Sequence, residues 1–314
     1  MTPTTSQTTG AATLRIGTRG SALALNQSGQ VGTAVGVATD CVVELVRIRT
    51  EGDVNAGPLA TIGGTGVFVT AVRTALHQGR VDAVVHSFKD LPTAPEPGLR
   101  AVAVPVREDP ADALCARDGL TLGGLPTGAR VGTGSPRRRA QLLAIRPDLV
   151  VEPIRGNVDS RLRAVDEGRL DAVVLAMAGL TRLGRTDAAT QRLAGMLPAP
   201  AQGALVVECR ADDTAWYVDA LTDLDHGPSR WAALAERALL AALEAGCTAP
   251  VGAIGTFSAD LLGLSGAVIA ADGSSEVRGY LEAPVSVDAG AADLGTALAA
   301  DLLERGAADL LGAP

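Results

Sequence analysis

Two copies of one short pattern limit the folds open to this chain more than any other feature of its sequence. Residues 79–85 read Gly-Arg-Val-Asp-Ala-Val-Val, and residues 168–174 read Gly-Arg-Leu-Asp-Ala-Val-Val. In each copy, a glycine that can end a helix is followed by a short apolar run typical of a buried strand. A helix–strand junction that recurs in this way is typical of a duplicated α/β unit. The sequence therefore predicts two similar α/β lobes.

The residues around each copy support that division. The elements expected in the first lobe are strands at 14–19, 41–48 and 82–86, with helices up to about 37 and at about 67–77. Those expected in the second lobe are strands at 129–133, 149–154 and 171–175, with one helix that bears Arg137, Arg138 and Arg139 and another at 158–167. Because strands and helices alternate in both, each lobe is predicted to be an α/β layer structure.

The pattern changes after about residue 198. A Pro/Ala/Gly loop precedes a strand at 204–209, and a long Ala/Leu helix follows at about 229–245. Two strand-like runs and a final helix complete the chain, which indicates a smaller α+β domain. The predicted domains are lobe 1 at 11–105 with 200–225, lobe 2 at 106–199, and a C-terminal domain at 226–314. A cleft between two such lobes is a common place for a ligand.

Composition excludes several classes of function. A formal net charge of −8 and only 2% aromatic residues disfavour a nucleic-acid partner. No apolar run is long enough to span a membrane, and the polar N-terminus lacks a secretory signal pattern. The four cysteines are sparse and the three histidines share no metal-ligand spacing. We therefore expect a cytoplasmic protein with reduced thiols and no metal site.

Arginines are concentrated at a few places in this acidic chain. Arg137, Arg138 and Arg139 are consecutive, and Arg155, Arg161 and Arg163 follow closely. Arginine binds carboxylates through two parallel hydrogen bonds and keeps its charge at any physiological pH. The clusters predict a site for a polyanion, although a single arginine on a helix is as often simply solvated.

Four loops could carry the chemistry of such a site. Ser21 and Ser135 each lie where a strand gives way to a helix, so they either help to bind an anion or only cap the helix. Lys89 and Asp90 follow a strand end, where the carboxylate is either an acid/base group or half of a solvated pair. Cys247 lies in a loop after a helix and is either a reactive thiol or a buried inert one.

Taken in order, these segments resemble the porphobilinogen deaminase family from about Leu14 through the C-terminal helix. The matching stretches are Leu-Arg-Ile-Gly-Thr-Arg-Gly-Ser at 14–21, His-Ser-Phe-Lys-Asp-Leu-Pro at 86–92, Gly-Thr-Gly-Ser-Pro-Arg-Arg at 132–138, Arg-Gly-Asn at 155–157, Ala-Gln-Gly at 201–203, Glu-Cys-Arg at 208–210 and Leu-Glu-Ala-Gly-Cys at 243–247. The resemblance implies two periplasmic-binding-protein-like lobes and a third domain that carries the cofactor. It also implies a cytoplasmic monomer with porphobilinogen as its substrate and neither nucleic acid nor membrane as a partner.

The resemblance further implies a role for individual residues. Cys247 would hold a dipyrromethane cofactor through a thioether, and Asp90 would be the catalytic carboxylate. The residues implied to bind the cofactor are Ser87, Lys89, Thr133, Ser135, Arg137, Arg138, Arg155 and Gly156. Those implied to bind the substrate are Arg19, Ser21, Arg155, Arg161, Arg182 and Gln202. Four porphobilinogen molecules would condense on the primer with loss of ammonia, and water would then release hydroxymethylbilane.

Three positions depart from the family pattern, and two other functions compete with this one. Thr61 and Thr65 stand where lysines are frequent, and Gly134 stands where serine is common, so we expect altered substrate affinity at most. A two-lobed binding protein for a small carboxylate would share the architecture but would not explain Cys247 or the third domain. An effector-binding regulator would need a basic helix-turn-helix extension, which the sequence lacks.

Overall fold

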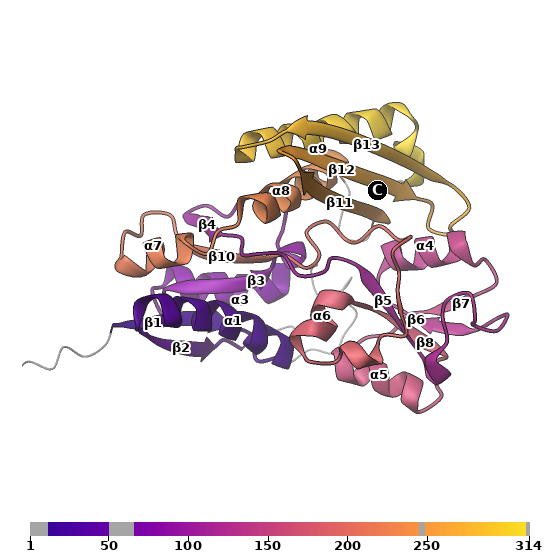
Figure 1. Ribbon diagram of the computed structural model, residues 1–314, viewed down its shortest axis with the longest axis horizontal. Helices are drawn as coiled ribbons and strands as arrows, with labels where there is room; N and C mark the ends of the chain where they lie inside the picture. The colour runs from indigo at the N-terminus through magenta and orange to yellow at the C-terminus, as the bar shows by residue number, and fades with distance from the viewer. Residues whose placement is uncertain (1–11, 50–65, 245–248, 312–314) are drawn as a thin grey trace, which may run out of the picture.

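The computed structural model describes residues 12–49, 66–244 and 249–311, with the side chains of residues 66–68 excepted. Cys247, Thr61 and Thr65 therefore lie outside the described residues. The chain forms two five-stranded sheets and one three-stranded sheet, each covered by helices (Figure 1). This arrangement confirms the prediction of two α/β lobes with a small C-terminal α+β domain. In the described part of the chain, no helix has the length and apolar character needed to cross a membrane.

Lobe 1 is built on the sheet order β2-β1-β3-β10-β4. Its strands are β1 (Thr13–Thr18), β2 (Val42–Arg47), β3 (Ala83–Ser87), β4 (Leu99–Ala103) and β10 (Leu205–Arg210). Its helices are α1 (Ala22–Thr39), α3 (Gly66–His77) and α7 (Trp216–Thr222). The first three strands are parallel, whereas β10 runs antiparallel between β3 and β4.

Lobe 2 repeats this plan with the order β7-β6-β8-β5-β9. Its strands are β5 (Asp112–Ala116), β6 (Arg130–Gly132), β7 (Val150–Glu152), β8 (Ala172–Ala176) and β9 (Gln191–Arg192). Its helices are α4 (Pro136–Ile145), α5 (Val158–Asp166) and α6 (Met177–Arg182). Strands β6, β7 and β8 are again parallel, and one strand, β5, runs antiparallel between β8 and β9, but here that strand comes first along the chain.

The aspartate of the duplicated pattern has the same structural task in both lobes. Asp82 Oδ2 accepts a hydrogen bond from the backbone N–H of Arg15 at 2.8 Å, and Asp171 Oδ2 accepts one from that of Arg130 at 2.7 Å. In return, the aspartate N–H donates to the arginine carbonyl at 2.8 Å in both places. Each pair therefore aligns two neighbouring parallel strands, β1 with β3 and β6 with β8, which explains why the pattern occurs twice.

The C-terminal domain consists of a three-stranded antiparallel sheet under two helices. Its elements are α8 (Gly227–Ala242), β11 (Val251–Ser258), β12 (Leu261–Ile269), β13 (Glu276–Pro284) and α9 (Asp288–Glu304). Leu239, Leu264 and Leu298 are fully buried between helices and sheet. The sequence predicted two strands here and missed β11. That strand contains Gly252 and Gly255, where an added Cβ would lie 2.7 Å from Leu197 and 2.9 Å from Ala232. Close packing therefore requires glycine at two positions where a strand usually has a β-branched or aromatic residue, and the strand pattern is weak.

Two chain segments pass between the lobes, at 104–111 and 198–204, and α8 of the C-terminal domain lies against both. Arg107 pairs with the fully buried Glu236 of α8 through two hydrogen bonds of 2.6 and 2.9 Å. Glu236 also accepts from the N–H of Ala201 at 2.6 Å and from that of Gly255 at 2.7 Å. One buried carboxylate thus joins both crossing segments to the third domain. Four 3-10 turns complete the described elements: Phe88–Asp90, Arg117–Gly119, Thr186–Ala188 and Ala307–Leu310.

Candidate active site

A one-turn 3-10 helix, η1 (Phe88–Asp90), follows the end of β3 and carries the predicted catalytic carboxylate. Phe88 is buried, and the guanidinium of Arg237 on α8 lies 4.5 Å from its ring centroid. Arg237 also donates to the carbonyls of Phe88 and Leu91 at 3.0 Å each. The C-terminal domain therefore fixes this loop from behind. Asp90 is left exposed and Lys89 half-buried.

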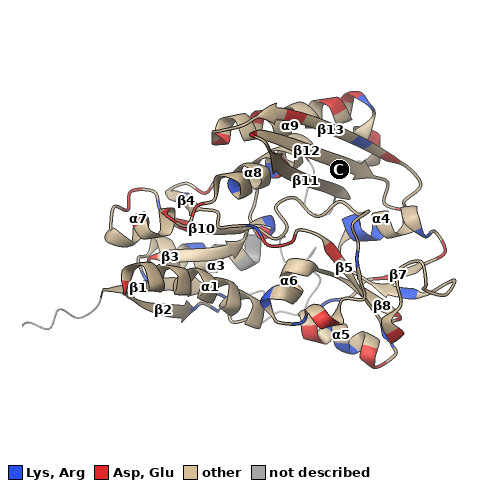
Figure 2. Cartoon of the chain, in the orientation of Figure 1, with Lys and Arg blue, Asp and Glu red and all other residues tan. Residues whose placement is uncertain are grey.

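Lobe 2 contributes the arginine pair from the first turn of α4. Arg137 and Arg138 are both buried, and between them lies the fully buried carboxylate of Asp112 at the start of β5. Arg137 Nη1 donates to Asp112 Oδ2 at 2.7 Å, while Arg138 donates to Oδ1 from Nε at 3.0 Å and from Nη2 at 2.7 Å. Burial alone would raise the pKa of Asp112, but the two positive charges outweigh it and hold the pKa well below its usual value. Figure 2 shows this basic turn of α4 beside the acidic start of β5.

Gln202 connects this arginine pair to the loop of lobe 1. Its Nε2 donates to Asp112 Oδ1 and to the carbonyl of Pro110, each at 2.8 Å. Its Oε1 accepts from Lys89 Nζ at 3.2 Å. Desolvation, together with the charges of Arg138 and Arg137, lowers the pKa of Lys89 to about 8 against the opposing effects of Asp90 and Asp112. Four of the residues implied by the resemblance are therefore brought together: Lys89, Arg137, Arg138 and Gln202.

Two more of the predicted arginines border this cluster. Arg182, at the end of α6, donates from Nη2 to the carbonyl of Gly203 at 2.8 Å. Arg161, on α5, donates from Nε to the carbonyl of Gly156 at 2.9 Å. Burial lowers the pKa of both guanidinium groups, and the charge of Arg138 adds to that effect for Arg161. Arg155 lies in the loop that precedes α5 and is exposed.

The small polar residues of the two anion loops cap helices. Ser21 Oγ accepts from the N–H of Ala24 at 3.3 Å, and Ser135 Oγ accepts from that of Arg138 at 3.4 Å. Thr133 is buried, and its Oγ1 accepts from the N–H of Ser135 at 3.1 Å. At Gly134 an added Cβ would lie 3.0 Å from the carbonyl of Ile154, so the serine common in the family requires a slightly different loop. Ser87 and Arg19 are half-buried, at the end of β3 and in the loop after β1 respectively.

The charges and the buried N–H groups fit a ligand that carries several carboxylates. Among the described residues, Nε of Arg137 and Nε of Arg182 are buried without a hydrogen-bond acceptor. A buried N–H without an acceptor costs about 1–3 kcal/mol, so such atoms are expected where a ligand supplies the acceptor. Asp112 is the one buried carboxylate beside three cations, Lys89, Arg137 and Arg138, which leaves the described cluster with net positive charge. The acetate and propionate groups of a dipyrromethane fit both features.

Some predicted members of the arginine clusters lie elsewhere. Arg139 is exposed and donates from Nη1 to the carbonyl of Val151 at 2.7 Å, away from Asp112. Arg163 is also exposed. Asp112 was not among the predicted site residues, although a charged residue in the apolar run Ala-Asp-Ala-Leu-Cys indicates a buried ion pair. No cluster of three or more potential metal-ligating side chains occurs in residues 12–49, 66–244 and 249–311.

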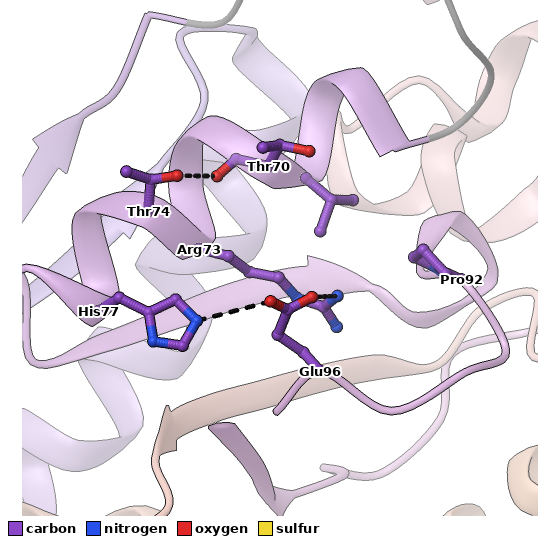
Figure 3. Close-up of a pocket in the computed structure, with 7 residues that line it drawn as sticks. Thr70, Arg73, Thr74, His77, Pro92 and Glu96 are labelled. Carbon is purple, nitrogen blue, oxygen red and sulfur yellow. Dashed lines mark hydrogen bonds and ion pairs between the residues drawn. The ribbon is translucent and has the colours of Figure 1, made fainter. Parts of the chain in front are cut away.

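A second group of charges supports β3 from the side of α3. Arg73 donates to Glu208 at 2.7 and 2.9 Å and to Glu96 at 3.1 Å, while His86 Nε2 lies 3.3 Å from Glu208. Burial would raise the pKa of Glu208, but His86 and Arg73 lower it to about 2. Arg73, Glu96 and His77 also line a small pocket of their own (Figure 3). Because its cations are paired with carboxylates, this pocket lacks the excess positive charge of the cleft.

Comparison with known proteins gives matches over nearly the whole chain. Residues 14–217 match the family model described as "Porphobilinogen deaminase, dipyromethane cofactor binding domain", and residues 231–304 match "Porphobilinogen deaminase, C-terminal domain". A porphobilinogen deaminase of Nocardia farcinica is 53% identical over 309 residues, 95% of this chain and 88% of that protein. One of Thermobifida fusca is 54% identical over 301 residues, 93% of this chain and 94% of that protein.

The solved structures that match the chain are much more distant in sequence. The methionine-binding protein MetQ is 13% identical with a TM-score of 0.45, and covers 68% of this chain and 89% of its own. A Salmonella typhimurium periplasmic binding protein with arginine specificity is 18% identical with a TM-score of 0.38, over 68% of this chain and 92% of its own.

Proposed function

The chain belongs to the porphobilinogen deaminase family, and from this premise we propose which of its residues perform the family's reaction. The protein is a transferase of tetrapyrrole biosynthesis. It condenses four porphobilinogen molecules head to tail with loss of ammonia on a dipyrromethane primer and then releases hydroxymethylbilane by hydrolysis. What remains to be assigned is the part played by each residue of the cleft.

The observation that carries our assignment is the buried positive charge between the lobes, with unsatisfied Nε atoms on Arg137 and Arg182. Every pyrrole unit carries two carboxylates, so each added ring brings more negative charge into one cleft. Arginine suits this task because its charge is permanent and its donors match a carboxylate. Residues proposed to hold the cofactor are Ser87, Lys89, Thr133, Ser135, Arg137, Arg138, Arg155 and Gly156. Residues proposed to hold the substrate are Arg19, Ser21, Arg155, Arg161 and Arg182.

We assign the attachment of the cofactor to Cys247, which lies outside the described residues. When bound, the cofactor supplies a pyrrole ring whose free α-carbon is the nucleophile of the first condensation. Two of the described thiols are less suited to attachment: burial raises the pKa of Cys115 and of Cys209 to about 12, which disfavours the reactive thiolate.

We assign the stabilisation of charge in the reaction to Asp90. Its carboxylate stands exposed at the end of β3, while the neighbouring Lys89 is drawn back toward Gln202. An exposed carboxylate in this position can accept the pyrrole N–H of a ring as positive charge develops on it, and can take up the proton that the ring must lose. Lys89 and the arginine pair of lobe 2 would hold the side-chain carboxylates of the same ring.

The remaining assignments concern the whole molecule. We propose a cytoplasmic monomer that has neither nucleic acid nor membrane as a partner, which the acidic, aromatic-poor composition supports. We also retain the division into 11–105 with 200–225, 106–199, and 226–314, which the membership of the three sheets supports.

One experiment tests both site assignments. Intact mass and turnover are measured for the wild type and for Asp90→Asn and Cys247→Ser. We expect a wild-type mass excess of two pyrrole units that is absent in Cys247→Ser and retained in Asp90→Asn, together with a kcat about 10²–10³-fold lower in Asp90→Asn. If Cys247→Ser still carried the extra mass, the cofactor would be attached at another residue. If Asp90→Asn kept a near-normal kcat, the charge-stabilising role would belong to another residue.

A further inference from the structure

Gln202, like Arg182, is a buried side chain through which the two lobes touch, and it contacts Lys89 on one side and Asp112 on the other. It is 1% exposed and lies in the second crossing segment, between lobe 2 and β10 of lobe 1. Its two Nε2 hydrogens are used by Pro110 and Asp112, both at 2.8 Å. Because an amide nitrogen has only two hydrogens, Gln202 has no donor left for a substrate carboxylate.

The partners of Gln202 require a side chain that both accepts and donates hydrogen bonds. The ammonium group of Lys89 can only donate hydrogen bonds, and the ionised carboxylate of Asp112 can only accept them. A side chain between them must accept on one side and donate on the other, as glutamine does. A carboxylate here would face Asp112 with a second negative charge, and an amine would face Lys89 with a second positive one.

Through Asp112 this contact extends to the arginine pair. The same Asp112 oxygen that accepts from Gln202 also accepts from Arg138 at 2.7 and 3.0 Å, and its other oxygen accepts from Arg137 at 2.7 Å. Lys89 therefore lies at one end of a continuous set of hydrogen bonds, and the two guanidinium groups of lobe 2 lie at the other.

We propose that Gln202 is a positioning residue that sets Lys89 of lobe 1 at a fixed distance from Arg137 and Arg138 of lobe 2 through Asp112. The proposal rests on the function assigned to these cations above and replaces the substrate contact that the sequence predicted for Gln202. Cations on two separate lobes bind one multiply charged ligand well only at one spacing of the lobes. Misplacing reacting groups by about 1 Å can reduce the rate about 10²-fold, so this spacing matters more for turnover than for capture of substrate.

The test compares variants that keep the shape of the side chain. Gln202→Met removes all three contacts, and Gln202→Glu keeps the acceptor for Lys89 but removes the donor to Asp112. The matched control is Gln141→Met. Gln141 is also a buried amide, with hydrogen bonds of 2.7 and 2.9 Å to the backbone of Leu197 only. Each protein is characterised by intact mass, thermal midpoint, kcat and KM.

We expect both Gln202 variants to keep the mass of the bound cofactor while kcat falls about 10–10²-fold and KM changes less than about threefold. Gln141→Met should lower the thermal midpoint comparably without this fall in kcat. The double variant Lys89→Met with Gln202→Met should be no slower than Lys89→Met alone, because Gln202 acts through Lys89.

Three results would overturn the proposal: a raised KM at unchanged kcat, which is the behaviour of a substrate contact; a similar loss of kcat in Gln141→Met; or additive losses in the double variant. Failure of the underlying function would look different, because the wild type itself would then carry no extra mass and form no hydroxymethylbilane.

Discussion

At the scale of single residues, the positive charge of the site arises because its cations outnumber its carboxylates. Arg137 and Arg138 are adjacent in the sequence and share one counter-ion, Asp112, so the group keeps positive charge after internal pairing. The density of arginines indicated this site from the sequence. The apolar run around Asp112 could have indicated a buried ion pair, but its partners Arg137 and Arg138 are distant in the sequence and are not visible in that local pattern.

Lys89 makes the cleft sensitive to pH. Its pKa is lowered to about 8, so the side chain is charged below that pH and increasingly neutral above it. If its charge attracts substrate carboxylates, kcat/KM for porphobilinogen should fall as the pH rises through about 8, by up to about tenfold per pH unit. The variant Lys89→Arg remains charged and should show a flatter profile over the same range.

The comparison between these two proteins removes the titration of the substrate, which is common to both. Measuring kcat/KM from about pH 6.5 to pH 10 is sufficient. An unchanged fall in Lys89→Arg would mean that the titrating group is not Lys89.

At the scale of elements, the duplicated pattern predicted more than its length suggests. It located the third parallel strand of both lobes, β3 and β8, because apolar runs after a helix-ending glycine are typical of buried strands. The antiparallel strand β10 of lobe 1 was predicted at 204–209, whereas β5 and β9 of lobe 2 were not predicted. β5 is short and opens with a charged residue, and β9 has only two residues, so neither carries a periodicity that could be recognised. Their place in the sheet is decided by contacts distant in the sequence.

Gly203 is the tightest point in the second crossing segment. Its φ is +88°, and an added Cβ would lie 2.4 Å from the carbonyl oxygen of Glu108 in the first crossing segment. Gly203→Ala should therefore destabilise the protein by roughly 2–4 kcal/mol, measured by denaturant unfolding. It should also raise KM, because the carbonyl that accepts from Arg182 is displaced.

Gly195→Ala provides the control for this prediction. Gly195 has no atom within 4 Å of the position its Cβ would take, and its φ lies outside the positive region. The substitution should leave stability within about 0.5 kcal/mol of the wild type. Equal losses at the two glycines would refute the argument from close approach.

At the scale of the whole molecule, three domains meet around two chain crossings, and the C-terminal domain acts as their common support. Arg237 on α8 holds the loop of Asp90, and Glu236 beside it holds both crossing segments. The sequence predicted a third domain chiefly as the carrier of Cys247. Its second role was not predictable, because Arg107 and Glu236 are separated by more than a hundred residues and each looks like an ordinary surface charge in isolation.

Glu236→Gln tests whether this support governs the stability of the whole chain. Glu236 accepts four hydrogen bonds while fully buried, two of them from Arg107. A glutamine has one acceptor oxygen, and its NH₂ would face donors, so the charge of Arg107 would stay buried without its counter-ion. Breaking a buried pair from one side costs about 3–5 kcal/mol, and we expect a loss of that size in denaturant unfolding.

The same change at Glu276, whose pair with Arg278 is exposed, should have an effect close to experimental error. Comparable small losses at both positions would mean that the crossings are held by packing alone, whereas a large loss only at Glu236 would establish that one carboxylate joins the lobes to the third domain.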